Sequence, residues 1–305
     1  MTEARNIQNE IGWIGVGKMG NPMASRLIEA AHRLTICDPV AENRASLVAR
    51  GARVVATPAE VAARCGIVFS TIPDDAALAD VVYGGADGGG LLTRIGAGAV
   101  LVEMSTVSPE ISRRVAEGLA RRGVFYLRCP ISGSTTLARA GSLTALASGD
   151  AVAWERAAPL LDVLTARRFY LGRGEEARYM KLVLNTLVGA TSAILGEALA
   201  LGAAGGLGDA QMMEVIAESA VASPLIRYKQ ETITQRDFSP AFSVTQMMKD
   251  FTLITEAARA RQVPMFAANL ILQQYTAAAN VGYADKDFFA LVEWMRVAYG
   301  IDMDA

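Results

Sequence analysis

The succession of strands and helices changes once along the chain, near Gly174, and this change most constrains the fold. Before it, short β-rich runs alternate with segments of helical spacing. Strands separated by helices indicate right-handed crossovers and a mostly parallel sheet. After it, the pattern predicts only successive helices, beginning with one long helix over residues 175–204. The sequence therefore predicts two domains, an α/β domain over residues 1–174 and an all-helical domain over residues 175–305, joined by that helix.

The elements of the first domain can be placed approximately from β-branched runs and helical spacing. Strands are expected at residues 11–15, 34–38, 53–55, 67–72, 100–104, 124–127, 143–147 and 169–171. Helices are expected at residues 19–31, 41–50, 109–122 and 153–165. In the second domain, helix breaks are expected near residues 205–208, 223–224, 238–240, 264 and 282.

A glycine-rich turn lies between the first expected strand and the first expected helix. Its glycines have the spacing GxGxxG. Glycines in this pattern allow a tight turn, close approach of the backbone to a pyrophosphate and close helix–strand packing, while the helix N-terminus supplies amides and partial positive charge. A glycine turn without a ligand is the simpler alternative. We expect a Rossmann-type domain that binds a dinucleotide through Gly15, Val16, Gly17, Lys18, Met19 and Gly20.

Asp38, at the end of the second expected strand, indicates which dinucleotide binds. A carboxylate at this distance beyond the glycine turn can accept hydrogen bonds from the ribose hydroxyls of the adenosine. It would repel a 2′-phosphate, and Pro39 stands where an arginine would favour NADP. NAD is therefore the expected cofactor, with NADP as the alternative. A purely structural role for Asp38 in an Asp-Pro turn is the competing interpretation.

Composition argues against several classes of partner. The chain has 29 Lys and Arg against 31 Asp and Glu, and this net charge of −2 does not favour nucleic-acid binding. The longest uncharged apolar stretch, residues 182–196, is shorter than the about 20 residues that span a bilayer, and the N-terminus does not resemble a signal peptide. Three single cysteines predict neither a disulfide framework nor a metal site. We expect a soluble cytoplasmic protein with no nucleic-acid, membrane or metal partner.

Lys181 lies near the start of the expected long helix, at one end of a stripe of small and polar residues. The stripe continues with Asn185, Gly189, Ser192 and Gly196, within about 80° of one another on a helix of 3.6 residues per turn. One interpretation is a packing seam, with the lysine extended toward solvent. The other is a cleft wall, on which Lys181 with a lowered pKa is a general acid/base and Asn185 orients a substrate.

Together with their neighbours, these residues resemble the β-hydroxyacid dehydrogenases over nearly the whole chain. This family includes 3-hydroxyisobutyrate dehydrogenase, tartronate semialdehyde reductase and the glyoxylate/succinic semialdehyde reductases. Its motif Met-Gly-x-Pro-Met-Ala, far more specific than GxGxxG, is present at residues 19–24. Its substrate motif Asp-Ala-Pro-Val-Ser-Gly-Gly is partly matched at residues 128–134, and its Gly-x-Leu-Thr is present at residues 141–144. Its catalytic Lys-Leu-Val-x-Asn is matched at residues 181–185, and its last motif by Phe242 with residues 249–251.

The resemblance implies a Rossmann-type domain and an all-helical domain, with the catalytic lysine on the long helix between them. It implies that Lys181 is the general acid/base. The residues that it assigns to the substrate, a small carboxylate, are Ser132, Gly133, Asn185, Phe242 and Asp250. The residues that it assigns to the cofactor, beyond the turn and Asp38, are Ile72, Pro73, Ser105, Thr106 and Lys249.

The chain departs from the family pattern only in or beside the substrate motifs. The departures are Arg128 and Cys129 for Asp-Ala, Ser134 and Leu137 for glycines, and Leu184 for a first Asn. They bear on the identity of the substrate rather than on cofactor use. A side chain at position 134 is also expected to narrow the carboxylate pocket.

The predicted function is hydride transfer between a nicotinamide and a small 3-hydroxy acid or the matching semialdehyde. An imine reductase-like or other reductase is an alternative, although imine reductases usually carry Asp or Tyr where this chain has Lys181. 6-Phosphogluconate dehydrogenase is disfavoured, because no His follows Lys181 in a Lys-x-x-His-Asn pattern. A non-catalytic NAD-binding interaction protein is the alternative of another class. Apolar Ala/Gly-rich faces at residues 199–208 and 266–279 further predict a homodimer or homotetramer formed through the helical domain.

Overall fold

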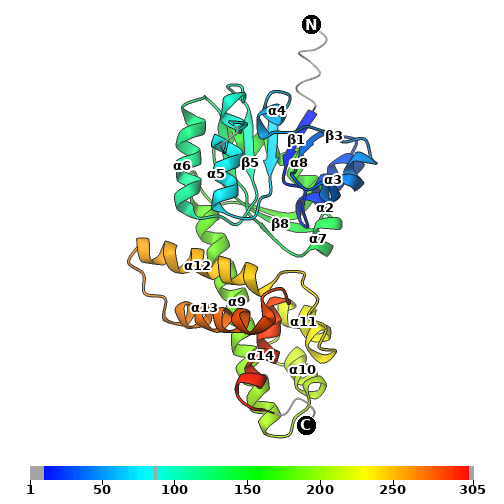
Figure 1. Cartoon of the computed structure of the whole chain (residues 1–305), viewed down its shortest axis with the longest axis vertical. Helices are drawn as coiled ribbons and strands as arrows, with labels where there is room; N and C mark the ends of the chain where they lie inside the picture. The colour runs from blue at the N-terminus through cyan, green and yellow to red at the C-terminus, as the bar shows by residue number, and fades with distance from the viewer. Residues whose placement is uncertain (1–9, 86–87, 302–305) are drawn as a thin grey trace. The chain divides into compact units, whose positions relative to one another are not determined.

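The chain divides into an α/β unit and a helical unit (Figure 1). The computed structural model describes residues 10–85 and 88–301. Compact unit 1 is Met1–Lys181 and unit 2 is Leu182–Ala305. The predicted fold class is therefore confirmed. The units divide within the long helix α9 (Glu176–Ala204), later than the predicted domain boundary after residue 174, because the first turns of α9 bond to unit 1.

Unit 1 is built on one nine-stranded sheet. Its strand order is β3-β2-β1-β4-β5-β6-β8-β7, and β9 pairs with β8. Pairing is parallel from β3 to β6, whereas β8 runs antiparallel to β6 and β7 and parallel to β9. The strands are β1 (Glu10–Ile14), β2 (Arg33–Cys37), β3 (Arg53–Val54), β4 (Ile67–Ser70), β5 (Val100–Glu103), β6 (Phe125–Arg128), β7 (Ile131–Ser132), β8 (Leu143–Gly149) and β9 (Thr165–Tyr170).

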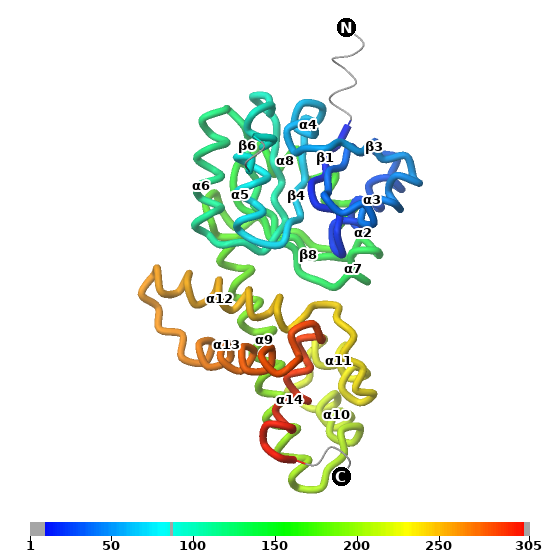
Figure 2. The backbone as a smooth tube through the Cα atoms, viewed as in Figure 1, coloured from blue at the N-terminus to red at the C-terminus, as the bar shows by residue number. Residues whose placement is uncertain are grey.

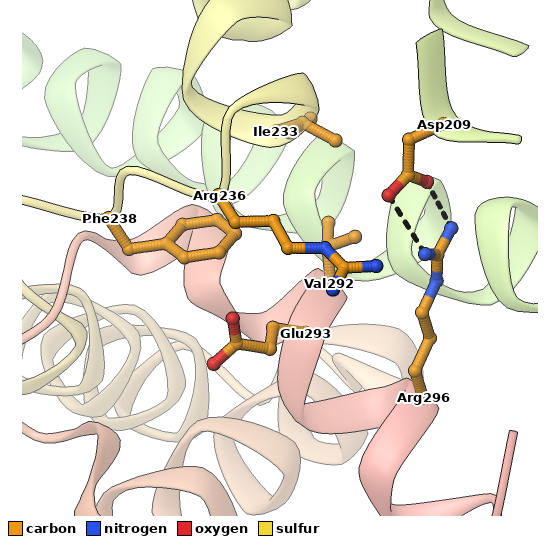
Figure 3. A pocket seen from close by; sticks show the side chains of 7 residues that line it. All are labelled: Asp209, Ile233, Arg236, Phe238, Val292, Glu293 and Arg296. Carbon is orange, nitrogen blue, oxygen red and sulfur yellow. Dashed lines mark hydrogen bonds and ion pairs between the residues drawn. The ribbon is translucent and has the colours of Figure 1, made fainter. Parts of the chain in front are cut away.

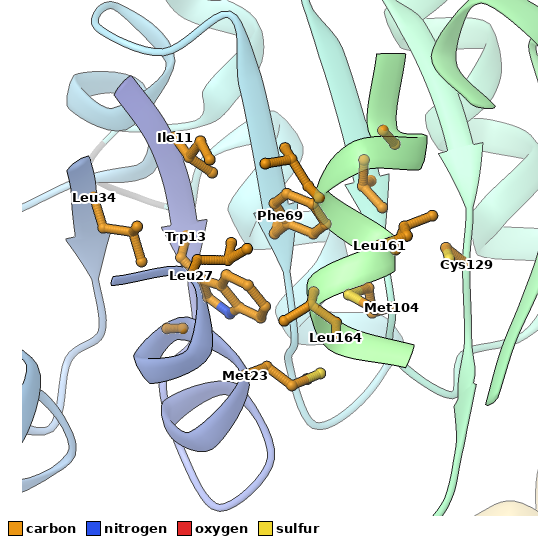
Figure 4. Close-up of a cluster of buried hydrophobic side chains, with 14 of the residues drawn as sticks. Ile11, Trp13, Met23, Leu27, Leu34, Phe69, Met104, Cys129, Leu161 and Leu164 are labelled. Carbon is orange, nitrogen blue, oxygen red and sulfur yellow. The ribbon is translucent and has the colours of Figure 1, made fainter. Parts of the chain in front are cut away.

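Helices cover both faces of this sheet and enclose two separate apolar cores. Alternate strand residues point to opposite faces, so Trp13 and Phe69 join one core while Ile14 and Val68 join the other. The ring of Trp13 stacks on that of Phe69, with centroids 5.0 Å apart, beneath side chains of α2 and α8 (Figure 4). The helices of the unit are α2 (Gly20–Glu29), α3 (Ala41–Val48), α4 (Pro58–Ala62), α5 (Asp75–Tyr83), α6 (Pro109–Ala120), α7 (Thr135–Arg139) and α8 (Ala151–Leu164), with a 3₁₀ turn at Leu91–Thr93.

Unit 2 packs helices around a third core. Within it, α12 and α13 lie side by side (Figure 2). Its elements after α9 are α10 (Asp209–Glu218), α11 (Pro224–Thr234), α12 (Val244–Ala260), α13 (Phe266–Ala278), short turns at Ala279–Tyr283 and Phe288–Ala290, and α14 (Leu291–Ala298). Over the part of this unit that the structure describes, the only β pairing is an isolated bridge between Ser243 and Asp287.

Several short elements differ from the sequence prediction. The strand β7 and the helices α4, α5 and α7 were not predicted, because two to nine residues give too little periodicity to recognise. The cap signals of these helices were nevertheless present, since Thr57, Asp74 and Ser134 each accept a hydrogen bond from the first helical turn.

The helix α9 is longer than the apolar stretch considered from the sequence. By length and mean hydropathy alone it is long and apolar enough to cross a membrane. Of its most apolar 18-residue segment, 39% is buried. Side chains on one face of it, among them Leu195 and Leu199, belong to the core of unit 2. A core helix of a globular protein satisfies the same criterion.

Candidate active site

Residues predicted to bind the cofactor gather at the carboxyl edge of the sheet in unit 1. The strands β2, β1, β4 and β5 are neighbours in that order, and their carboxyl ends lead into Asp38, Gly15, Ile72 and Ser105 respectively. The chain moves outward from β1 in one direction to β2 and β3, and in the other to β4 and β5. Ligands of open parallel sheets bind at this kind of switch point, outside the carboxyl ends of the strands.

The three glycines of the turn are required for different reasons. Gly15 has φ of +80°, and a Cβ there would lie 2.1 Å from the carbonyl oxygen of Thr71. A Cβ on Gly20 would lie 2.2 Å from the carbonyl oxygen of Gly15. A Cβ on Gly17, by contrast, would meet its nearest atom, on the side chain of Asn43, only at 3.8 Å. The fold therefore needs no glycine at 17, and the open space above it fits a pyrophosphate.

The helix that follows the turn supports the same assignment. The N-cap residue of α2, Met19, makes no side-chain cap, and no acidic residue lies in the first turn. The partial positive charge at this helix end is thus not offset by the chain's own first-turn side chains, as anion binding requires. Residues 15–20 fit the pyrophosphate of NAD or NADP.

Asp38 combines the two interpretations drawn from the sequence. It is 6% exposed, and one carboxylate oxygen accepts a hydrogen bond of 2.7 Å from the backbone N–H of Val16. The other oxygen accepts bonds from the N–H of Val40 and the side chain of Asn43. Asp38 thus shapes the glycine turn, and its remaining lone pairs can still accept from a ribose.

The loops after β4 and β5 are bonded to one another. The hydroxyl of Ser105 accepts a 2.8 Å hydrogen bond from the backbone N–H of Ile72. The N–H of Ser105 in turn donates to Glu103. Pro73 is exposed and Thr106 half-buried beside these two residues. The two loops that carry the four residues predicted for the nicotinamide side are therefore bonded to one another through Ile72 and Ser105.

In the predicted carboxylate site, Ser132 is the last residue of β7, and Gly133 follows it in the turn before α7. Gly133 has φ of +137°, which favours glycine. Ser134 caps α7, since its hydroxyl accepts from the N–H of Leu137, and this gives the departure at position 134 a structural role. The side chain of Leu137 is 41% exposed.

The departures at 128 and 129 are buried in unit 1. Arg128 donates to Glu175 over 2.7 Å and lies over the ring of Tyr126. Cys129 is fully buried, and burial raises the pKa of its thiol to about 12. Both side chains thus pack inside unit 1, and their bearing on substrate identity stays a prediction.

Lys181 lies on α9, whose start is bonded to unit 1 at successive residues. The hydroxyl of Ser148 donates to the carbonyl of Gly174 and accepts from the N–H of Ala177. Arg178, one turn before Lys181, is buried and donates to the backbone carbonyl of Ser105. Lys181 itself is half-buried.

Most of the polar stripe that continues from Lys181 is a packing seam. A Cβ on Gly189 would lie 2.1 Å from the ring of Phe251, and one on Gly196 would lie 2.6 Å from the sulfur of Met295. Ser192 is buried and donates to the carbonyl of Phe288. For these three residues the cleft-wall interpretation was wrong, because small side chains let α9 approach its neighbours closely.

Asn185, the next residue of the stripe after Lys181, belongs to a polar cluster in unit 2. Its side-chain amide donates to Asp250, and both residues are buried. Lys249 forms an ion pair of 2.7 Å with the same carboxylate. Phe242 contacts the ring of Phe288 edge-on, with centroids 6.0 Å apart. Unit 2 therefore brings Asn185, Asp250 and Lys249 together, and the contact of Asp250 orients the Asn185 amide.

Thr71, which follows β4 and bonds to the glycine turn, was missed in the sequence. The hydroxyl of Thr71 donates to the carbonyl of Gly15 and accepts a 2.9 Å bond from the indole N–H of Trp13. It thereby connects the end of β4 to β1 and to the glycine turn. Its place at the end of an expected strand was the available signal.

A small hollow in unit 2 is lined by none of the predicted residues (Figure 3). The ion pair of Asp209 with Arg296 borders it, and Arg296 donates over 2.8 Å to one of the carboxylate oxygens. The residues that line it are Asp209, Ile233, Arg236, Phe238, Val292, Glu293 and Arg296.

Comparison with known proteins agrees with this geometry. The family model for the NAD-binding domain of 6-phosphogluconate dehydrogenase matches residues 10–172, and the model described as NAD-binding of NADP-dependent 3-hydroxyisobutyrate dehydrogenase matches residues 175–295. The chain belongs to the β-hydroxyacid dehydrogenase family. It is an NAD(P)-dependent oxidoreductase of the hydroxyacid dehydrogenase type.

Individual relatives match over almost their full length. Glyoxylate/succinic semialdehyde reductase 1 of Arabidopsis thaliana is 31% identical, over 94% of this chain and 98% of that protein. NAD-dependent L-serine dehydrogenase of Pseudomonas aeruginosa is 32% identical, over 92% and 95%. Among solved structures, 3-hydroxyisobutyrate dehydrogenase from Salmonella typhimurium has a TM-score of 0.85 at 25% identity, over 93% and 99%.

Proposed function

We propose that Lys181 is the general acid/base of this dehydrogenase and that Asn185 orients the reacting oxygen of a small 3-hydroxy acid. The observation that carries the proposal is that buried Asp250 orients the side-chain amide of Asn185. Asn185 lies one helical turn beyond Lys181 on α9. An aspartate carboxylate accepts only from the NH2 group of an asparagine amide, so the amide oxygen faces away from the carboxylate. The oxygen of the amide then remains to accept a bond from a substrate hydroxyl.

Bound NAD or NADP supplies the hydride acceptor or donor of the reaction. In oxidation, neutral Lys181 takes the proton from the substrate hydroxyl; in reduction, its ammonium group returns that proton to the alkoxide oxygen. The backbone amides of Ser132 and Gly133 hold the substrate carboxylate, and Phe242 bounds the substrate. Fixing both ends of a small substrate in this way lowers the barrier by orientation.

The decisive test removes the amine of Lys181 and keeps an unbranched side chain of nearly the same length. In Lys181→Met we expect kcat to fall about 100-fold or more, while the affinity for NAD(P), measured by intrinsic fluorescence, stays near that of the wild type. The matched control is Lys286→Met, since Lys286 pairs with Glu293 and lies outside the proposed site. Near-normal turnover of Lys181→Met would remove Lys181 from this role.

The substrate class is tested by absorbance at 340 nm with both cofactors. The panel contains small 3-hydroxy acids, L-serine, glyoxylate, succinic semialdehyde and a cyclic imine. We expect turnover of a hydroxy acid or semialdehyde and none of the imine. Turnover of the imine alone would favour the imine reductase alternative, and binding of cofactor without any turnover would favour the non-catalytic one.

We further propose that NAD is preferred over NADP, because Asp38 presents its negative charge beside the glycine turn. The ratio of kcat/KM for NAD⁺ over NADP⁺ should exceed about tenfold, which corresponds to about 1.4 kcal/mol. Asp38→Asn keeps the shape of the side chain but removes the charge, so it should narrow this ratio. An unchanged ratio would leave Asp38 with only its structural role.

We also propose that the enzyme works in the cytoplasm as a homodimer or homotetramer, without nucleic-acid or membrane partners. The three cysteines are free and buried, which suits a reducing compartment. The oligomer is supported by apolar side chains that unit 2 exposes, and its test is given in the Discussion.

A further inference from the structure

A fully buried ion pair lies where the sheet of unit 1 meets the start of α9. Glu103, the last residue of β5, has no exposed surface, and Arg178 of α9 is 1% exposed. The guanidinium of Arg178 pairs with the carboxylate of Glu103. Arg178 also donates to Tyr126, to Ser112 and, over 2.7 Å, to the backbone carbonyl of Ser105.

This pair connects the two loops predicted for the nicotinamide side. One oxygen of Glu103 pairs with Arg178, while the other accepts a 2.9 Å bond from the N–H of Ser105. Ser105 is thus bonded at three points. Its carbonyl accepts from Arg178, its N–H donates to Glu103, and its hydroxyl accepts from the N–H of Ile72. A continuous chain of bonds runs from α9 to the loop after β5 and then to the loop after β4.

The guanidinium of Arg178 stays charged in this buried setting. Burial alone would lower the pKa of Arg178, but Glu103 and Tyr126 outweigh that effect and raise the pKa above its ordinary value. An ion pair that is buried and satisfied on both sides gives a site a single geometry, because any displacement leaves a charge unpaired.

We propose that Glu103 and Arg178 are positioning residues, which set the place of Lys181 relative to the cofactor loops of unit 1. The inference rests on the proposed role of Lys181, which lies three residues beyond Arg178 on the same helix. A small misplacement of a reacting group costs a large factor in rate. Arginine is needed because a lysine cannot reach the carboxylate, the Ser105 carbonyl and Tyr126 in one planar fork.

The test replaces Arg178 by Lys, which keeps the charge. We expect kcat of Arg178→Lys to fall ~10- to 100-fold, with the Kd for NAD(P) within about threefold of the wild type. Hydride transfer should then limit turnover, so the primary deuterium isotope effect on kcat, measured with deuterated substrate, should increase. A milder variant, Tyr126→Phe, removes one acceptor of Arg178 and should likewise lower kcat and increase the isotope effect. It tests the inference even where Arg178→Lys does not fold.

The matched control is Arg296→Lys in unit 2, where Arg296 makes a comparable buried pair with Asp209. Arg296→Lys should lower the melting temperature but leave kcat and the isotope effect of the folded enzyme unchanged. If Arg178→Lys and Tyr126→Phe behave in the same way as this control, the pair serves only stability and the inference is overturned. Full activity of Lys181→Met would instead overturn the proposed function itself, so the two failures are distinguishable.

Discussion

Gly15 and Gly17 lie two residues apart in one turn, and the structure separates what each of them does. The backbone of Gly15 has a positive φ and lies against the backbone of Thr71, so a side chain there is opposed by both conformation and space. Gly17 has neither restriction. Two glycines of one motif therefore have different roles. Gly15 is required by the fold, whereas Gly17 leaves space for the ligand.

The two alanine variants test this division. Gly15→Ala should lower the free energy of unfolding by about 1–3 kcal/mol, because its Cβ would lie 2.1 Å from a backbone oxygen. Gly17→Ala should leave that free energy within about 0.5 kcal/mol of the wild type and weaken NAD(P) binding about tenfold. Urea denaturation and fluorescence titration measure the two effects. Equal loss of stability in both variants would contradict the division.

At the scale of elements, α9 approaches α12 through a glycine. Gly189 lets the ring of Phe251 contact the helix backbone, and Phe251 packs against Tyr275 of α13 with centroids 5.7 Å apart. A β-carbon at 189 would have to displace that ring, since 2.1 Å is far below any contact distance. The small residues of the stripe are thus explained by helix packing.

Gly189→Ala should therefore destabilise unit 2 by about 1–3 kcal/mol through overpacking, although alanine is by about 1 kcal/mol the better helix former. Shortening the facing ring by Phe251→Leu should relieve the overlap. In a double-mutant cycle by urea denaturation, the loss in Gly189→Ala/Phe251→Leu should be smaller than the sum of the single losses, with a coupling of about 0.5–3 kcal/mol. Additive losses would show that α9 and α12 do not meet at this point.

For the molecule as a whole, one notable feature of the helical unit is a set of large apolar side chains that it exposes. Leu187, Ile194 and Leu201 follow one another at intervals of seven on α9 and are 63%, 63% and 77% exposed. Phe266 at the start of α13 is 84% exposed. Exposed apolar residues that share one face of a helix are typical of interaction surfaces.

We expect light scattering coupled to size exclusion to give the mass of a dimer or tetramer at micromolar concentration. A charge at the centre of the α9 row, in Ile194→Glu, should shift the protein toward monomer while leaving the secondary structure intact by circular dichroism. The matched control is Val152→Glu, an exposed apolar position of α8 in unit 1. A wild-type protein that elutes only as a monomer would contradict the prediction.

Much of the fold could be predicted because its signals are local. The alternation of strands and helices, the glycine turn and the start of a long helix near 175 each depend on residues close in sequence. β7 and the short helices α4, α5 and α7 escaped prediction because neighbouring elements stabilise them. In the candidate site, Asp38 and Asn185 could be predicted from spacing, whereas Thr71 could not, since its contacts with Gly15 and Trp13 join neighbouring strands of the sheet.

The sequence by itself determined the order of elements, the glycine turn and the family, because local periodicity and motif spacing survive without knowledge of distant contacts. Only the tertiary structure decided which polar residues are partners. It paired Arg128 with Glu175, Glu103 with Arg178 and Asn185 with Asp250. It also assigned Gly189, Ser192 and Gly196 to packing. Such pairings join residues far apart in the chain, and burial, which raises the cost of an unpaired charge, selects among them.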